Sequence, residues 1–237
     1  YILGYHKSLL HTKEIIGNPK DWILSSGVLA KSFKVKRDVE IPEFPLIVNG
    51  DLHKLSNNFN FENPGKSPFF NTGIIFDRQC YSIDTDPDYT GPKTLLKDII
   101  QPDNEVDDSF FIDKDSLDKW KYLKGAKNLD KINKNGYSYK YNEGPMVFPD
   151  PLDKPARTII TGEGGKGPSR FKHVVQTPKG LRRLTPIELE RVNTFPDNHT
   201  KGESETTRAF LMGNALIVKV VEKIGEELYS FISSNYK

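Results

Sequence analysis

The local structure of this chain is specified most fully by RRLTPIELERVNTFP, residues 182–196. Thr185 and Glu188 have the spacing of a capping box, in which each side chain accepts a hydrogen bond from the other residue's backbone N–H. Pro186 takes the first helical position, where its missing N–H removes no hydrogen bond. The stretch therefore predicts a helix from Pro186 to about Thr194, ending before a Phe-Pro pair.

A longer helix is predicted downstream, from about Ala215 to Ser233. Its apolar residues recur at helical spacing with charged residues between them, which predicts an amphipathic helix facing a core. These apolar residues are Leu216, Ile217, Val220, Val221, Ile224, Leu228, Phe231 and Ile232. At the start of the shorter helix, Leu184 can pack against Leu189 as a hydrophobic staple.

The middle of the chain predicts short strands separated by long loops. Residues 73–83 indicate a hairpin around a polar turn, and residues 137–141 alternate like an edge strand. One or two helical turns are expected at 93–100, and a short helix at 116–124. Together with the C-terminal helices, these elements predict an α+β fold.

The first part of the chain gives weaker signals. Residues 23–35 fit a strand or a short helix, and residues 36–66 are polar with few helix signals. The opening stretch Tyr1–Tyr5 is apolar and strand-like. A buried strand at the first residue predicts a piece of a larger fold; the alternative is the trimmed terminus of a complete domain.

The composition allows a buried core and excludes several classes of protein. Hydrophobic residues make up 36% of the 237 residues, and no apolar run is long enough to span a membrane. A single cysteine, Cys80, excludes an internal disulfide and a cysteine-based zinc site. The five histidines have no metal-ligand spacing, so no metal site is expected. These features fit a cytoplasmic protein.

Charge is unevenly distributed along the sequence. Between Arg157 and Arg183 there are seven basic residues against one acid, whereas between Asp103 and Asp118 there are seven acids against one lysine. Separated charge predicts a basic face that a polyanion can approach and an acidic face turned away from it. Such runs are also common on ordinary solvated surfaces.

The basic segment contains PARTIITGEGGKGPSRFKHV, residues 155–174. A β-branched run precedes a glycine-rich loop, and glycines allow a backbone to approach a phosphate or base edge closely. The G-x-G-x-x-G spacing within it does not indicate a dinucleotide site, because no apolar helix follows. An ordinary polar loop is the alternative. The candidate nucleic-acid contacts are Arg157, Thr161, Gly164, Gly165, Lys166, Ser169, Arg170, Lys172 and His173, with Lys166, Arg170 and Lys172 the strongest.

Three blocks occur in order: residues 155–173, 182–196 and 210–218. They resemble the late conserved motifs of bacterial DNA (cytosine-5) methyltransferases, and residues 67–73 and 89–94 match one subgroup. The resemblance implies an irregular, short-stranded target-recognition domain at 41–184, including a Thr-Ile-Ile-Thr strand at 158–161. It also implies a remnant of the catalytic domain at 1–40. The helices at 185–237 would belong to an α/β Rossmann-like domain that is mostly absent.

The resemblance implies transfer of a methyl group from S-adenosylmethionine to a flipped cytosine in double-stranded DNA, in a restriction-modification system. Asn214 and Ala215 would lie beside the methionine end of the cofactor, although Gly213-Asn214 also fits a plain helix cap. Most of the cofactor site would belong to the missing N-terminal half.

The family's cofactor loop, Pro-Cys nucleophile, Glu-Asn-Val acid and Arg-x-Arg pair have no counterpart in these 237 residues. Cys80 follows Gln79 instead of proline, so we expect no catalytic residue and no activity from the chain alone. Its expected partners are double-stranded DNA and an N-terminal catalytic half. The alternatives are a natural small subunit of a split methyltransferase and a non-enzymatic DNA-binding module; a relative acting on RNA is a further option.

Overall fold

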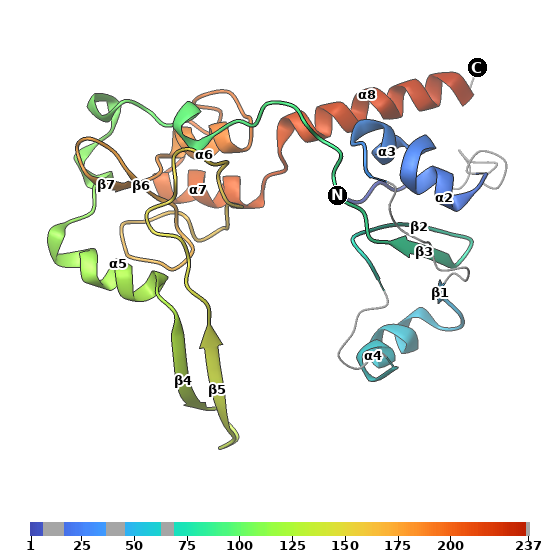
Figure 1. Ribbon diagram of the computed structural model, residues 1–237, viewed down its shortest axis with the longest axis horizontal. Helices are drawn as coiled ribbons and strands as arrows, with labels where there is room; N and C mark the ends of the chain where they lie inside the picture. Colours follow the sequence, from blue (N-terminus) through green and yellow to red (C-terminus); the bar gives the residue numbers. More distant parts are fainter. Residues whose placement is uncertain (7–16, 37–45, 63–68, 236–237) are drawn as a thin grey trace. The chain divides into compact units, whose positions relative to one another are not determined.

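The computed structural model describes residues 1–6, 17–36, 46–62 and 69–235 (Figure 1). These residues form two compact units. The first comprises residues 1–91 and 222–237, and the second comprises residues 92–221. Both contain short helices and short antiparallel strands, so the predicted α+β class is confirmed.

The first unit has a three-stranded antiparallel sheet in the order β1-β3-β2. Its elements are α2 (Pro19–Asp21), the π-helical η2 (Trp22–Ser26), α3 (Val28–Ser32), β1 (Leu46–Ile47), α4 (Leu52–Glu62), β2 (Thr72–Phe76) and β3 (Gln79–Ile83), followed by α8 (Val218–Asn235) from Glu222 onward. The predicted hairpin is confirmed as β2 and β3. Asp77 and Arg78 form its turn with φ of 49° and 63°, values typical of a two-residue hairpin turn.

Two expectations for the first unit were wrong. The segment with few helix signals contains α4, which begins after Asp51, whose carboxylate accepts a hydrogen bond from the His53 N–H at 2.8 Å. Tyr1–Tyr5 is irregular and forms no strand. Instead, Tyr5 lies edge-on against Trp22 and Phe231, so aromatic packing replaces a ladder of backbone hydrogen bonds.

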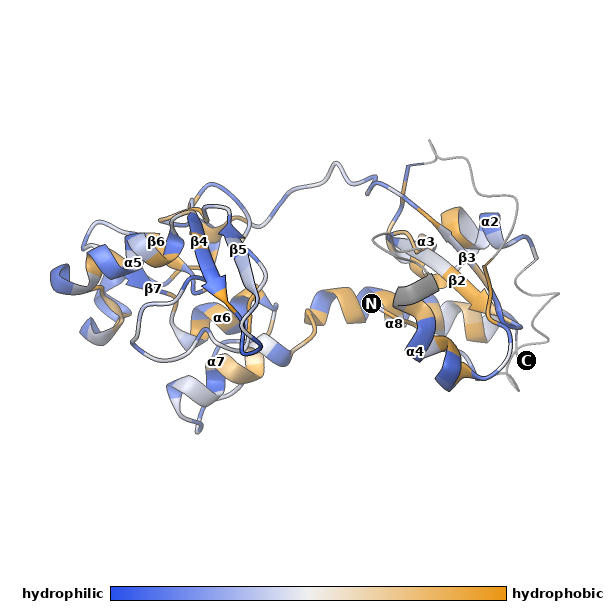
Figure 2. Cartoon of the chain, turned by 90° about the horizontal axis from the view of Figure 1, so that it is seen from below, coloured by the Kyte–Doolittle hydropathy of each residue, from blue (hydrophilic) through white to orange (hydrophobic). Residues whose placement is uncertain are grey.

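The helix α8 supplies the core of the first unit. Phe231 is buried against Trp22 and Val28, and Ile224 and Leu228 pack around them. Apolar and polar residues alternate along this helix in Figure 2. It begins at Val218, three residues later than predicted, while Leu216 is 60% exposed. The predicted amphipathic helix is therefore confirmed for its later turns, where Ile224, Leu228 and Phe231 face the core.

The second unit contains four single turns of 3₁₀ helix, three helices and two separate hairpins. Its elements are η3 (Leu96–Asp98), η4 (Asp103–Glu105), η5 (Asp108–Phe110), η6 (Lys114–Ser116), α5 (Leu117–Lys124), β4 (Lys127–Ile132), β5 (Ser138–Glu143), β6 (Val174–Gln176), β7 (Leu181–Arg183), α6 (Pro186–Val192) and α7 (Glu205–Asn214). The predicted helix at 116–124 and the predicted edge strand at 137–141 are confirmed as α5 and β5.

The capping box at α6 is formed as predicted. The Thr185 hydroxyl accepts from the Glu188 N–H at 3.2 Å, and the Glu188 carboxylate accepts from the Thr185 N–H at 2.8 Å. Leu184 and Leu189 are both buried in the core of the second unit. The helix ends at Val192, two residues before the predicted end.

The Thr-Ile-Ile-Thr strand is not formed. Residues 155–160 are irregular, and only Ile159 of the β-branched run is buried in the core. The backbone of Ile160 and Thr161 packs directly against Gly213 of the helix α7 instead of pairing with a strand. The helix α7 was not predicted from the sequence. Ser204 caps it by accepting a hydrogen bond from the Thr207 N–H at 3.1 Å.

None of the helices in the described part of the chain combines the length and hydrophobicity required to cross a membrane.

Candidate nucleic-acid interface

The glycine-rich loop is held in place from inside by two cations. The Lys172 ammonium donates to the carbonyl oxygens of Gly165 and Gly167 at 2.8 and 2.7 Å, and Arg183 donates to the Gly165 oxygen at 3.0 Å. Gly165 has φ of +81°, a conformation that other residues rarely adopt. A Cβ added at Gly164 would come within 2.9 Å of the Thr206 Cα. The loop therefore requires glycine for its shape and close packing.

A buried hydrogen-bonded pair, Glu163 and His173, adjoins this loop. The Glu163 carboxylate lies 2.6 Å from His173 Nδ1 and accepts the His173 N–H at 3.1 Å. His173 is fully buried, and its Nε2 atom has no hydrogen-bond partner among the described residues. Lys172 and His173 thus support the loop from the interior. Their direct contact with a nucleic acid remains a prediction, and their burial disfavours it.

Arg170 joins the glycine-rich stretch to the β4–β5 hairpin. Its guanidinium donates to the backbone oxygens of Leu123 and Gly125, at 3.2 and 3.1 Å, and to that of Gly144. It also lies 3.1 Å from the Glu143 carboxylate. Leu123 lies at the end of α5, Gly125 lies between α5 and β4, and Glu143 and Gly144 lie at and after the end of β5. Arg170 therefore holds the hairpin at its root.

Arg157 is also engaged inside the unit. Its guanidinium donates to both carboxylate oxygens of Asp150, at 2.6 and 3.2 Å, and the same carboxylate accepts the Val174 N–H at 2.8 Å. The pair ties the segment before the glycine loop to β6. Arg157 therefore organises the base of the loop.

The surface of the glycine-rich stretch is formed by other residues. Thr161 and Lys166 are exposed, Ser169 is half-buried, and Phe171 is 48% exposed. An exposed aromatic ring beside basic residues is a common nucleic-acid contact, because any base can stack on it. Phe171 was not among the predicted contacts, although its place between Arg170 and Lys172 was a usable signal.

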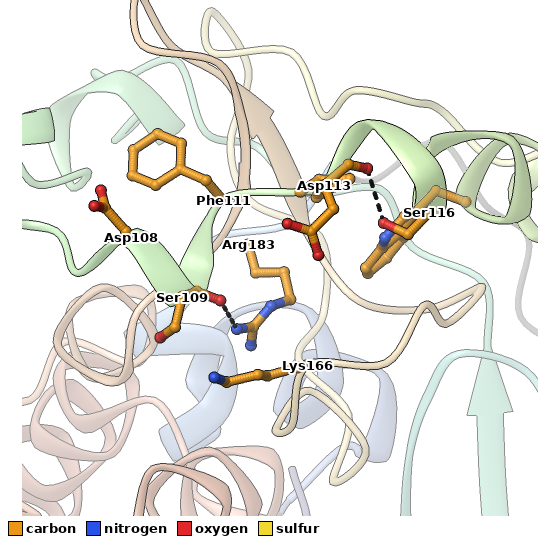
Figure 3. A pocket seen from close by; sticks show the side chains of 9 residues that line it. Asp108, Ser109, Phe111, Asp113, Ser116, Lys166 and Arg183 are labelled. Carbon is orange, nitrogen blue, oxygen red and sulfur yellow. Dashed lines mark hydrogen bonds between the residues drawn. The ribbon is translucent and has the colours of Figure 1, made fainter.

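Lys166 and Arg183 line a pocket of about 170 Å³ together with Asp108, Ser109 and Asp113 (Figure 3). Arg183 donates to the Ser109 carbonyl oxygen at 2.9 Å. Two carboxylates and two cations give this hollow mixed charge. It therefore lacks the uniformly positive lining of a phosphate-binding site.

The predicted separation of an acidic face from a basic face was wrong. Lys179 lies 2.5 Å from the Asp108 carboxylate and donates its backbone N–H to Asp103, while Arg182 lies 3.6 Å from Asp103. The acidic segment therefore packs directly on the basic one and neutralises part of it. The contacting residues are more than seventy positions apart in the sequence. Opposite charges attract strongly where water is partly excluded.

The β4–β5 hairpin carries exposed charge that the prediction of a single edge strand did not include. Its strands pair from Lys127 with Glu143 to Ile132 with Ser138. Lys131, Lys134 and Lys140 are exposed along it. The sequence signal was Asn135-Gly136 between two alternating stretches, a spacing typical of hairpins.

Among the described residues, no three His, Cys, Asp or Glu side chains gather in a way that could hold a metal ion. Asn214 is exposed at the end of α7, where its side-chain amide donates to the Phe210 oxygen at 3.0 Å. Ala215 is half-buried against the core. The amide of Asn214 and the methyl group of Ala215 suit contact with the edge of a small ligand. These two residues alone do not enclose a ligand.

The family described as C-5 cytosine-specific DNA methylase matches residues 49–230. The chain belongs to this family. It is 35% identical over 230 residues to the Type II methyltransferase M.Sau3AI of Staphylococcus aureus, covering 96% of this chain and 53% of that relative. It is 26% identical over 140 residues to the Type II methyltransferase M.Bsp6I of Bacillus sp. (strain RFL6), covering 58% of this chain and 42% of that relative. The chain thus spans about half the length of these relatives.

In this DNA methylase family member, all three sequence blocks that resemble the family's motifs lie in the second unit. Residues 155–173 form the glycine loop and its supports, 182–196 run from β7 through α6, and 210–218 join the end of α7 to α8. The first two blocks are joined by the hydrogen bond of Arg183 with Gly165.

Proposed function

We propose that this chain supplies the DNA-recognition part of a DNA (cytosine-5) methyltransferase that belongs to a restriction-modification system. The observation that carries this proposal is the family match across residues 49–230, which covers the glycine loop, the hairpin and the C-terminal helices. The Type II methyltransferases similar to the chain support the restriction-modification setting.

In the proposed reaction a cytosine is flipped out of the duplex, because its reactive carbon cannot be attacked within the base stack. The nucleophile would come from a segment outside these 237 residues. Cys80 does not suit that role, because it pairs with Leu46 and Ile75 within the β1–β3–β2 sheet and its burial raises the pKa of the thiol. S-adenosylmethionine would supply the methyl group, with Asn214 and Ala215 at the edge of its site.

For the proposed DNA contact, Thr161 and Lys166 present side chains at the surface of the glycine loop. The loop backbone around Gly164 and Gly165 can approach a phosphate or base edge without a side chain in the way. Arg157, Arg170, Lys172 and His173 would fix the loop and its neighbours in position. Ser169, which hydrogen-bonds the Phe171 N–H at 3.3 Å, would orient the exposed ring.

We retain the motif-based division into a catalytic remnant at 1–40, a recognition domain at 41–184 and bracing helices at 185–237 as part of the proposal. In the structure, the boundaries between the two compact units fall in the sequence between residues 91 and 92 and between residues 221 and 222.

A separate, non-enzymatic DNA-binding module is the second candidate. Around the junction of α7 and α8, within the second unit, several large apolar side chains are exposed: Phe210, Leu211, Leu216, Ile217, Val218 and Val221. Exposed apolar side chains that form a contiguous patch mark an interaction surface, and we propose that these residues form one. This exposed apolar surface favours a chain that works together with a catalytic domain, either on the same polypeptide or as a small subunit. It therefore speaks against the non-enzymatic module.

The test is complementation. The chain is mixed with a polypeptide comprising the part of M.Sau3AI that precedes its similarity to this chain, and transfer of tritiated methyl groups to plasmid DNA is measured. We expect transfer from the mixture and none from either polypeptide alone. Turnover by the chain alone would contradict the assignment of the chemistry to another segment. DNA binding without transfer, in the mixture or in a single-chain fusion, would favour the non-enzymatic module.

A further inference from the structure

We propose that the β4–β5 hairpin is a two-stranded ribbon that enters the major groove of duplex DNA and reads base edges with one of its faces. This inference rests on the proposed DNA-recognition function and adds to it a second contact element, outside the glycine loop.

The dimensions of the hairpin suit a groove. Each strand has six residues, so at about 3.4 Å per residue the ribbon is roughly 20 Å long. In Figure 1 the two strands extend together away from the rest of the second unit. The major groove of B-DNA, about 12 Å wide, admits a two-stranded β-ribbon.

The two faces of the ribbon differ in exposure. One face carries Lys127, Leu129 and Lys131 opposite Glu143, Tyr141 and Tyr139, and three of these residues are partly covered near the root. The other face carries Asn128, Asp130 and Ile132 opposite Asn142, Lys140 and Ser138. All six residues of this second face, which we call the open face, are exposed.

The open face has the side-chain chemistry of base recognition. Asparagine can pair bidentately with adenine, lysine can donate to guanine, an acid can accept from cytosine, and an apolar group can contact the thymine methyl. Ile132 is 73% exposed at the far end of β4.

The charge of the ribbon complements DNA. Residues 127–143 contain four lysines and two acids. Both acids have basic neighbours: Glu143 lies 2.9 Å from Lys127, and Asp130 pairs in register with Lys140. Hydrogen bonds from Tyr141 and Lys127 lower the pKa of Glu143 and keep it ionised. The excess positive charge therefore comes from Lys131, which lies over the Tyr141 ring, and from Lys134 in the tip.

The root of the ribbon is rigidly held. Arg170 bonds the backbone on both sides of the hairpin, and the Lys127–Glu143 pair closes the first rung. At the tip, the Asn133 side chain accepts the N–H groups of Asn135 and Tyr137, both at 2.9 Å. A ribbon fixed at both ends can present its open face with little loss of conformational freedom on binding.

The test uses the full chain and fluorescently labelled duplex DNA, with binding measured by anisotropy at several salt concentrations. The hairpin variant combines Lys131→Ala, Lys134→Ala and Lys140→Ala. The control variant combines Lys119→Ala, Lys154→Ala and Lys201→Ala, which are exposed lysines elsewhere in the second unit. Circular dichroism shows whether each variant is folded as the wild type is.

We expect the hairpin variant to bind about 10- to 100-fold more weakly. Its salt slope should be lower by about 2.7 if all three lysines contact phosphates, because each lost phosphate contact removes about 0.9 from the slope. The control should bind as the wild type does. If the wild type binds duplex DNA and the hairpin variant matches it, the ribbon proposal is overturned while the proposed function stands. If the wild type does not bind duplex DNA even at low salt, both fail.

Base reading is tested separately with Asn128→Ala plus Asn142→Ala on the open face. When duplexes are selected from a random library, the wild-type chain should enrich a defined sequence. The variant should enrich a much less defined set of sequences. Identical enriched sequences would overturn base reading by the open face. Double-stranded RNA is A-form, and its deep, narrow major groove cannot admit the ribbon. If the lysine substitutions weakened binding to double-stranded RNA as much as binding to duplex DNA, that result would also contradict groove insertion.

Discussion

The guanidinium group of Arg170 lies 3.1 Å from the carboxylate of Glu143 and thereby connects the glycine-rich stretch to the root of the β4–β5 hairpin. The two residues are 27 positions apart in a loop and a strand that the sequence predicts as separate features. Arg170 was expected to contact DNA directly. The contacts it makes describe a positioning residue, which holds another element in place.

The first prediction concerns this clamp. Arg170→Lys keeps the positive charge but loses the planar group that donates to three backbone oxygens at once. We expect Arg170→Lys and Arg170→Ala to weaken DNA binding to a similar extent and to speed hydrogen exchange in β4 and β5. If Arg170→Lys binds DNA as the wild type does, a direct charge contact is the better description.

The second prediction concerns Lys166, the exposed lysine of the glycine loop. If its ammonium neutralises one phosphate, Lys166→Ala should lower the slope of log affinity against log salt by about 0.9. Binding should weaken similarly for all duplex sequences. Lys154→Ala, at an exposed site away from the loop, serves as the control. A slope equal to that of the wild type would remove Lys166 from the DNA contacts.

The third prediction concerns the close approach of α7 to the segment before the glycine loop. A Cβ at Gly213 would overlap the backbone of Ile160 and Thr161. Gly213→Ala should therefore lower the free energy of unfolding by about 1–3 kcal/mol. Gly225→Ala, in α8 with open space around it, should instead stabilise by about 0.5–1 kcal/mol. Urea denaturation of both variants measures the contrast, and equal effects would rule out the steric explanation.

The fourth prediction concerns the buried pair of Arg182 and Glu188, both fully buried and 2.7 Å apart. Glu188→Gln leaves the buried guanidinium with only the Asp103 carboxylate, 3.6 Å away, and should cost about 3–5 kcal/mol of stability. Asp197→Asn breaks the more exposed pair with Arg191 and should cost less than about 1 kcal/mol. Thermal unfolding compares the two; similar losses would show that burial does not set the cost.

The fifth prediction concerns pH. Burial lowers the pKa of Lys124 from 10.5 to about 8, so the unfolded chain binds more protons than the folded chain between these values. The cost of burying this charge is fully present below pH 8 and is relieved as the pH rises toward 10.5. Relative to Lys124→Met, the wild type should therefore gain stability between pH 8 and pH 10. A difference independent of pH would contradict this.

Some residues of the candidate site were predicted from the sequence, and others were not. Gly164, Gly165 and Lys166 were placed in one surface loop, and the structure forms that loop. Phe171 lay within the quoted stretch and was not recognised, because an aromatic residue is buried more often than it is exposed. The acceptors of Arg170 were not found, since they do not follow from local spacing. The exposed lysines of the hairpin were missed although Asn135-Gly136 between two alternating stretches indicated the turn.

What the amino-acid sequence determined alone was local. The capping box of Thr185 and Glu188, the turn at Asp77 and Arg78, and the late turns of α8 follow from interactions within about four residues, which local spacing specifies. The partners of the charged side chains were decided only by the tertiary structure. Asp108 meets Lys179 across seventy-one positions, because ion pairs form between whichever charged groups the packed core brings together.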